Sequence, residues 1–225
     1  MRLCRSIRPS WFRWVFFIPS EEFSGLACVM RLILASASPR RRELLAAAGL
    51  QFEVVVSPAE EIHDASIPLD RLCEENACLK AEAVAREHPD AIVIGADTLV
   101  WIAGEPLGKP TDAIEARALL RKLSGRSHTV CTGVCLVRPD GSSERFHVLT
   151  EVEFRELDDA AIEDYLTLVH TLDKAGGYAI QEHGERVVVG IRGSYSNVVG
   201  LPVDEVVARL FPAGESGCGD AAIGG

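Results

Sequence analysis

Three consecutive arginines open a predicted helix that follows a short apolar strand. The segment reads SASPRRR over residues 36–42, with Ser38 and Pro39 at positions typical of an N-cap and a first helical residue. Cations at a helix N-terminus oppose the helix dipole unless an anion shares the site, and backbone N–H groups together with guanidinium groups bind phosphate well. Arg41 also falls on the apolar stripe of this helix, so we expect it to point into a cleft. A run of solvated charges is the alternative interpretation.

A carboxylate follows an apolar predicted strand over residues 91–96. This residue is Asp97, and ligand crevices commonly form where strands end. Asp97 is therefore a candidate to hold a divalent cation or to accept a proton from water. Glu60 and Glu61 follow the preceding predicted strand and can supply another carboxylate to the same metal. The alternatives are an aspartate that caps a turn and a solvated pair of glutamates.

Two lysines and a glutamine are further candidates for contacts with a phosphorylated ligand. The GEPLGKP segment has three residues between its glycines and Pro110 in place of Ser or Thr, which excludes a Walker A loop. Lys109 is still a candidate phosphate contact because the flanking glycine and proline fix the backbone. Lys80, on a long predicted helix, has a similar but weaker claim. Gln181 ends an unusual DKAGGYAIQ run, and its amide can both donate to and accept from an amide or carbonyl edge.

The elements that must position these residues alternate between short apolar runs and helical stretches, which favours an α/β domain. Strands are predicted over residues 32–35, 52–56, 91–96 with a continuation over 98–102 after a bend, 129–137, 145–154, 184–191 and 196–199. Helices are predicted over residues 38–49, 69–87, 112–125, 158–168 and 202–210. The turn cluster PDGS between two of the strands predicts that 129–137 and 145–154 form a hairpin.

The composition is that of an ordinary globular protein. The 225 residues are 48% hydrophobic and 25% charged, which argues against disordered, collagen-like and disulfide-scaffold classes and suggests one large domain or two small lobes. A net charge of −10 makes polymeric nucleic acid and anionic lipid poor partners. Seven cysteines, an odd number without a C-x-x-C motif, indicate reduced thiols in a cytoplasmic protein.

The composition changes at Met30. Residues 1–29 hold six of the aromatic side chains and a net positive charge, but Arg13 interrupts the apolar run and leaves it too short for a secretory signal or a membrane span. We expect residues 1–29 to be a disordered or non-native extension, with an interfacial peptide as the alternative. Residues 30–211 are then the folded domain, and the glycine-rich residues 212–225 are a disordered tail.

Six short motifs follow one another between Arg31 and Leu210. They read LASASPRRRELL, IGADT, GKP, LSGRSHTVCTG, DKAGGYAIQ and GSYSNVVGLP. In this order they resemble the Maf family of nucleoside triphosphate pyrophosphatases, sometimes called septum formation inhibitor proteins. The resemblance implies an elongated mixed central sheet flanked by helices, with two lobes around a cleft, similar to inosine triphosphate pyrophosphatases. It also implies a divalent metal, Mg²⁺ or Mn²⁺, and a possible homodimer.

The same resemblance implies a reaction and a role for each candidate residue. The reaction is hydrolysis of a nucleoside triphosphate to the monophosphate and pyrophosphate. Asp97 is then the proton acceptor that activates water and, with Glu61, a metal ligand. The implied substrate contacts are Ser36, Arg41, Lys80 and Lys109.

The resemblance also bears on which nucleotide is cleaved. Arg40, Thr98 and Gln181 resemble the specificity positions of the branch that cleaves dTTP and UTP. The branch that prefers 7-methyl-GTP typically has a bulky aromatic residue at the first position and glutamine at the second. A 7-methyl-GTP or broad noncanonical nucleotide pyrophosphatase, or a nucleotide-binding regulator of cell division, is the alternative.

Overall fold

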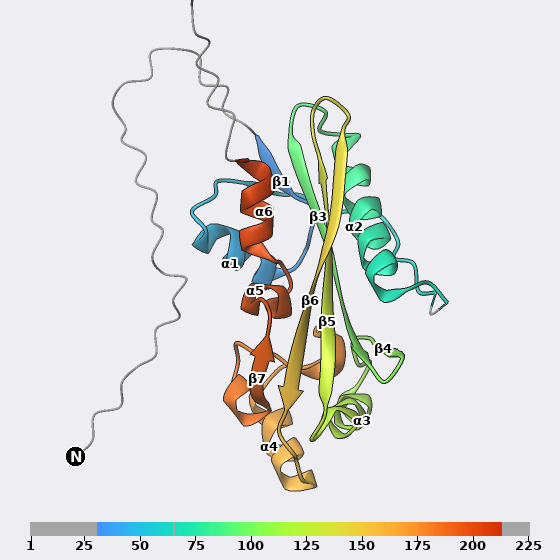
Figure 1. The fold of residues 1–225 in the computed structure, drawn as a ribbon, viewed down its shortest axis with the longest axis vertical. Helices are drawn as coiled ribbons and strands as arrows, with labels where there is room; N and C mark the ends of the chain where they lie inside the picture. The colour runs from blue at the N-terminus through green and yellow to red at the C-terminus, as the bar shows by residue number, and fades with distance from the viewer. Residues whose placement is uncertain (1–30, 65, 213–225) are drawn as a thin grey trace, which may run out of the picture. The chain divides into compact units, whose positions relative to one another are not determined.

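The computed structural model describes residues 31–64 and 66–212. The predicted N-terminal extension and nearly all of the predicted tail lie outside these residues. A mixed seven-stranded sheet forms the centre, in the order β2-β1-β3-β5-β6-β7 with β4 paired to β3 (Figure 1). In the part of the chain that the structure describes, no helix has the length and apolar character needed to cross a membrane.

The helices and strands follow most of the predicted segments. The strands are β1 Leu32–Leu34, β2 Glu53–Val54, β3 Ile92–Ile102, β4 Glu105–Leu107, β5 Ser127–Val137, β6 Ser143–Phe154 and β7 Val188–Arg192. The helices are α1 Pro39–Ala47, α2 Leu69–Ala85, α3 Ala113–Leu123, α4 Asp159–Leu168, α5 Tyr195–Val199 and α6 Val203–Leu210, with short 3-10 turns at Ala175–Gly177 and Gly184–Arg186. The predicted hairpin is confirmed, because β5 and β6 pair antiparallel from Ser127 opposite Glu153 to Val137 opposite Ser143.

Helices cover both faces of the sheet (Figure 1). Along β5, Val134 and Leu136 pack with Val206 of α6, whereas Cys135 packs with Ala77 of α2 on the opposite face. Side chains that alternate along a strand point to opposite faces, so the apolar run of β5 can be buried on both sides. The predicted mixed sheet with flanking helices is therefore confirmed.

The core divides into clusters at the two ends of the long strands. One cluster joins α3 and α4 to the sheet through Leu120, Phe154 and Tyr165. Another joins β1 to α6 through Leu34 and Val206. The long strands β3, β5 and β6 connect these ends, which leaves room for a cleft between the helices of one end and those of the other.

The predicted bend at Asp97 is wrong. Strand β3 is unbroken, and its pairing with β5 runs in register from Val93 to Trp101, with Asp97 opposite Gly133. On its other edge β3 pairs with β1 at residues 92–94 and with β4 at residues 100–102. Between these two pairings, no described strand pairs with this edge of β3. Asp97 therefore lies beside an unpaired edge in the middle of its strand, and not at the end of the strand.

Three other predicted strands differ from the structure. The second predicted strand shortens to Glu53–Val54, and the 184–191 segment begins as a 3-10 turn before β7. Residues 196–199 were predicted as a strand but belong to helix α5. The Ser194 side chain caps this helix by accepting a hydrogen bond from the Asn197 N–H, and this local contact outweighs the β-propensity of the two valines that follow.

Two glycines let α2 lie directly against the sheet. A Cβ atom at Gly133 would be 2.3 Å from the carbonyl carbon of Cys73, and one at Gly95 would be 2.2 Å from the Ala77 carbonyl oxygen. Real Cβ atoms do not approach backbone this closely, so only glycine allows this contact. The close contact brings the polar side chains of α2 to Asp97.

Candidate active site

One cleft of about 660 Å³ brings together the residues predicted for the site, except that Glu61 lines it and its neighbour Glu60 does not. It lies along the uncovered edge of β3 and receives side chains from both ends of the described chain. The predicted residues that line it are Ser36, Arg40, Arg41, Glu61, Lys80, Asp97, Thr98, Lys109 and Gln181. The sequence therefore predicted which residues gather in the cleft, although it misplaced Asp97 within its strand.

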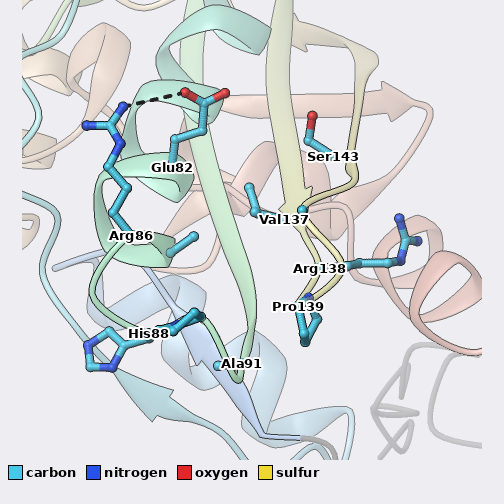
Figure 2. A pocket seen from close by; sticks show the side chains of 11 residues that line it. Glu82, Arg86, His88, Ala91, Val137, Arg138, Pro139 and Ser143 are labelled. Atoms are coloured by element: carbon cyan, nitrogen blue, oxygen red, sulfur yellow. Dashed lines mark ion pairs between the residues drawn. The ribbon is translucent and has the colours of Figure 1, made fainter.

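A second cavity lies far along the sheet from these residues. It has a volume of about 340 Å³ and is lined by Arg86, His88 and Arg138, near the turn between β5 and β6 (Figure 2). The Arg86 side chain is 77% exposed and its ion pair with Glu82 is long, at 3.9 Å. None of the predicted site residues lines this cavity.

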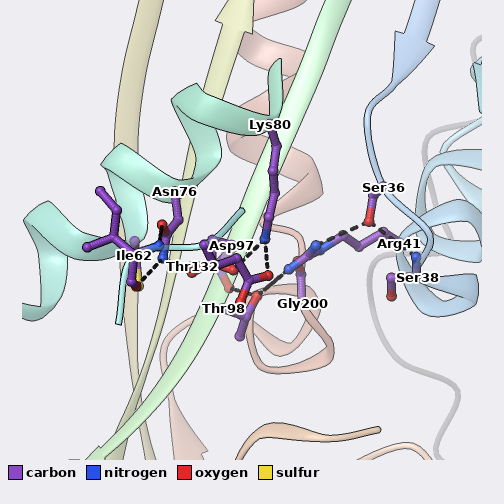
Figure 3. A network of polar contacts seen from close by, with 12 residues as sticks. Ser36, Ser38, Arg41, Ile62, Asn76, Lys80, Asp97, Thr98, Thr132 and Gly200 are labelled. Atoms are coloured by element: carbon purple, nitrogen blue, oxygen red, sulfur yellow. Dashed lines mark hydrogen bonds and ion pairs between the residues drawn. The ribbon is translucent and has the colours of Figure 1, made fainter. Parts of the chain in front are cut away.

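Asp97 is the buried carboxylate of the cleft, with only 5% of its surface exposed. Its Oδ1 accepts a hydrogen bond from the Lys80 ammonium at 2.7 Å (Figure 3). The same ammonium donates to Glu61 Oε1 at 2.6 Å, so one cation bridges two carboxylates from separate parts of the chain. This arrangement fixes Asp97, Lys80 and Glu61 as a unit.

Asn76 is a residue of this network that the sequence interpretation missed. Its Nδ2 donates to Asp97 Oδ2 at 3.2 Å and to the Ile62 carbonyl at 3.1 Å, and its Oδ1 accepts from the Ile62 N–H at 2.7 Å (Figure 3). Asn76 lies four residues before Lys80 on α2, and residues with this spacing share a helix face. That spacing was the one available signal.

Arg41 crosses the cleft from α1 and uses every guanidinium nitrogen. Nε donates to the Gly200 carbonyl at 2.8 Å, Nη1 to Ser36 Oγ at 3.2 Å, and Nη2 to Thr98 Oγ1 at 2.9 Å. These acceptors are uncharged, and Arg41 forms no ion pair within the described residues. Burial lowers the pKa of the Arg41 guanidinium, because loss of solvent disfavours its charged form and the nearby negative charge of Asp97 offsets this only in part. The site is therefore prepared for an anion.

The N-terminus of α1 faces the same side of the cleft. The Ser38 N–H donates to Ser36 Oγ at 3.2 Å, which fixes the small-residue turn before the helix. Pro39 occupies the first helical position, as predicted. Figure 3 shows Ser36 and Arg41 side by side, so the helix N-terminus and the guanidinium lie on one wall.

A second charged group of the cleft lies around Asp173. Arg40 Nη1 donates to Asp173 Oδ2 at 2.6 Å, and the nearly buried Lys174 donates to Asp173 Oδ1 at 2.9 Å. Partial burial by itself raises the pKa of Asp173, but the hydrogen bonds from Lys174 and Arg40 outweigh it and hold the pKa below its usual value. Gln181 and Lys109 line the cleft as exposed side chains.

Two carboxylates of the cleft, Asp97 and Glu61, are candidate ligands for a divalent cation. Among residues 31–64 and 66–212, no group of three or more His, Cys, Asp or Glu side chains is placed to hold a metal. Asp97 and Glu61, however, both contact one ammonium, so a single cation can lie within reach of both. Mg²⁺ commonly binds through one or two carboxylates and completes its shell with water and substrate phosphates. The donor set fits a metal of this kind.

The fold and the cation-lined cleft define an α/β protein with a site for a phosphorylated ligand. The Ham1 protein of Staphylococcus aureus has a similar fold, with a TM-score of 0.50 and 19% identity over 80% of this chain and 97% of that chain. A family model described as Maf-like protein matches residues 31–212, and the chain belongs to this family.

Curated relatives agree with this family. A "dTTP/UTP pyrophosphatase" of Akkermansia muciniphila is 56% identical over 179 residues, which cover 80% of this chain and 94% of the relative. A protein of the same name from Deinococcus radiodurans is 47% identical over 189 residues, covering 84% of this chain and 96% of the relative. The shared residues extend over nearly the whole length of both relatives.

Proposed function

We propose that the chain hydrolyses nucleoside triphosphates, dTTP and UTP foremost, to the monophosphate and pyrophosphate in the cytoplasm. The observation that carries this proposal is the buried Asp97 carboxylate, held by Lys80 on the floor of a cleft that Arg41 also lines. The names of the curated relatives support the same substrates. The second polar group, around Arg40 and Asp173, is proposed to recognise the nucleobase.

Asp97 is the proposed general base. The oxygen of a water molecule bonds to phosphorus, its proton passes to the Asp97 carboxylate, and the bond between the α- and β-phosphates breaks to release pyrophosphate. A general base must lie within hydrogen-bond reach of the water, and the open edge of β3 gives Asp97 access to the cleft. Hydrogen bonds from Lys80 and Asn76 fix the carboxylate in one orientation.

Arg41 and Lys109 are the proposed anchors for the triphosphate. A nucleoside triphosphate carries about four negative charges near neutral pH, and positioning with charge stabilisation supplies most of the catalysis in phosphoryl transfer. Arg41 has no carboxylate partner among the described residues, and Ser36, Thr98 and Gly200 hold it in place. Its guanidinium therefore gains a counter-ion when substrate binds.

Asp97 and Glu61 would hold a divalent cation, Mg²⁺ or Mn²⁺, together with substrate phosphates. When bound, such a cation neutralises charge on the phosphates and on the departing pyrophosphate. Lys80 already supplies a positive charge to both carboxylates. The two carboxylates are thus kept close together before any metal or substrate arrives.

Arg40, Thr98 and Gln181 are the proposed specificity residues. Arg40 is fixed by Asp173, and Gln181 is free to meet a base edge with its amide. The Thr98 hydroxyl instead contacts Thr132 at 3.0 Å, in addition to its bond from Arg41. We therefore propose that Thr98 contributes to nucleotide specificity in two ways, through its small side chain and through the hydrogen bond that holds Arg41.

The test is pyrophosphate release from dTTP, UTP, CTP, 7-methyl-GTP and ITP, each with Mg²⁺ or Mn²⁺. Selective turnover of dTTP and UTP supports the proposal, and turnover spread over the panel supports a broad pyrophosphatase. Binding without turnover would contradict the proposal and favour a nucleotide-binding regulator. We also infer a homodimer from the family resemblance, which light scattering of the purified chain tests.

A further inference from the structure

We infer that Asn76 is a positioning residue that fixes the Asp97 carboxylate and the backbone beside Glu61 relative to each other. The inference rests on the proposed function, because it concerns the geometry of the proposed base and metal ligand. Asn76 does not line the cleft in which we propose that substrate and metal bind. It acts through the two carboxylates.

The Asn76 side chain makes three hydrogen bonds in a site that is only 2% exposed. One joins its Nδ2 to Asp97 Oδ2, and the other two join the amide to both the N–H and the carbonyl of Ile62. The side-chain amide has two donor hydrogens and an acceptor oxygen, so these contacts use both donors. Aspartate lacks the donors, and glutamine carries them one methylene further from the backbone.

The contacts form a closed ring around the two carboxylates. Asn76 binds Ile62, which is the residue after Glu61, and Glu61 binds Lys80, which binds Asp97 in turn. Asp97 closes the ring through its second oxygen to Asn76. Each member is therefore held by two neighbours, and hydrogen-bonded networks of this kind hold their members more rigidly than isolated pairs.

The ring explains how Glu61, a loop residue, can be held in position as a metal ligand. Glu61 lies in the long connection between β2 and α2, and its side chain is exposed. A glutamate in such a connection samples many positions unless its backbone is fixed. The paired bonds from Asn76 to Ile62 supply this restraint, because they hold the adjacent peptide groups at both the donor and the acceptor.

The experiment compares Asn76→Ala and Asn76→Asp with Val84→Ala. Val84 is a buried residue of α2 that does not line the cleft and makes no hydrogen bond to the ring, so its truncation weakens the same helix without touching the ring. kcat and KM for dTTP are measured with Mg²⁺ at a temperature where every variant is folded. Hydrogen exchange of the Ile62 amide is measured on the same proteins without substrate or metal.

Both Asn76 variants are expected to lose about 10- to 100-fold in kcat, the range typical when residues that orient a metal ligand are removed. KM should change less than about threefold, since the triphosphate contacts of Arg41 remain. Asn76→Ala should also speed exchange of the Ile62 amide by about tenfold or more, because its acceptor is gone. Val84→Ala should keep the wild-type kcat and the slow Ile62 amide.

Two results would overturn the inference. One is a kcat within about twofold of wild type in either Asn76 variant, and the other is an Ile62 amide that stays protected in Asn76→Ala. An equal loss of kcat in Val84→Ala would also overturn it, since that loss reports general weakening of α2. Failure of the proposed function looks different: the wild-type chain itself would release no pyrophosphate from dTTP.

Discussion

Gly133 lies directly opposite Asp97 in the β3–β5 pair. Because Gly133 has no side chain, the backbone of α2 at Cys73 packs onto the sheet at this point. The helix that supplies Lys80 and Asn76 therefore approaches the sheet closely enough for both side chains to reach Asp97. The geometry of the proposed base depends on a residue of the neighbouring strand.

Gly133→Ala should therefore destabilise the protein and reduce turnover. The new Cβ would lie 2.3 Å from backbone that cannot rotate away, so α2 must shift. Overpacking of this kind costs about 1–3 kcal/mol, and we expect the upper part of that range in the free energy of unfolding. Urea denaturation measures it. Gly190→Ala in β7 is the matched control, because no atom lies within 4 Å of its added Cβ. Equal unfolding midpoints for the two variants would contradict the close packing of α2.

Arg41→Lys should lower kcat/KM nearly as much as Arg41→Ala. The guanidinium donates from three nitrogens to three separate acceptors, and a lysine ammonium cannot reproduce this fork. Loss of charged hydrogen bonds to the triphosphate is worth about 10- to 100-fold in kcat/KM for dTTP. Steady-state kinetics tests this against Arg42→Ala, an exposed neighbour that does not line the cleft. Similar losses at positions 41 and 42 would indicate a general effect of charge on the helix.

Asp173→Ala should weaken nucleobase selection more than triphosphate binding. Asp173 holds Arg40 by an ion pair at 2.6 Å, and the freed arginine can then take several positions. The ratio of kcat/KM for dTTP to that for CTP should fall by about tenfold, the scale of a few hydrogen bonds in specificity. Glu163→Ala removes the partner of Arg117 in an exposed ion pair outside the cleft, and this control should leave the ratio unchanged. If the ratio is unchanged in Asp173→Ala, then Asp173 does not position Arg40 for nucleobase selection.

The free energy of unfolding should decrease as the pH falls below about 6.5, because the buried His128 resists protonation in the folded state. Its ring is buried against Phe154 and Tyr178, its Nε2 lies 2.8 Å from the Tyr178 hydroxyl, and burial lowers its pKa to about 4. The pKa is depressed in the folded state, so the unfolded chain takes up the proton first. The contribution is therefore fully present above pH 6.5 and is lost as the pH falls toward 4.

The loss from this single group is about 3 kcal/mol over that interval. It is measured as the difference in free energy of unfolding between pH 7 and pH 4.5, in the wild type and in His128→Phe. The phenylalanine fits the aromatic cluster but cannot titrate, so its pH dependence should be shallower. Parallel pH profiles for the two proteins would show that His128 is not the responsible group.

The helices and strands that the sequence predicted correctly have a long hydrophobic pattern or a clear boundary residue. Helix α2 and the β5–β6 hairpin agree with their predicted segments because burial on a regular face repeats over many residues. The 196–199 segment is too short for its hydrophobic periodicity to distinguish a helix from a strand. Its helical conformation depends on the N-cap at Ser194. The unbroken β3 at Asp97 depends on its register with β5, which no local pattern contains.

The candidate site was predictable where residue type and motif carry the signal. Asp97 and Arg41 are charged residues within motifs that are unusual for a core, Lys80 was a weaker candidate on a long helix, and the structure places all three in one cleft. Asn76 and Asp173 depend on contacts with residues more than ten positions away, such as Ile62 and Arg40. Asn76 has the sequence neighbours of an ordinary helix residue, and Asp173 begins the DKAGGYAIQ motif, but nothing in that motif indicates its ion pair with Arg40.

The most direct measurement is the rate of pyrophosphate release from dTTP with Mg²⁺ by the wild-type chain and by Asp97→Asn. The substitution keeps the size and polarity of the side chain but removes the proton acceptor, so the rate should fall by about 100-fold or more, as is typical of a general base. The urea midpoints of the two proteins should stay close, to show that the fold is intact. A folded Asp97→Asn variant that retains more than about a tenth of the wild-type rate would contradict the role of Asp97 as general base.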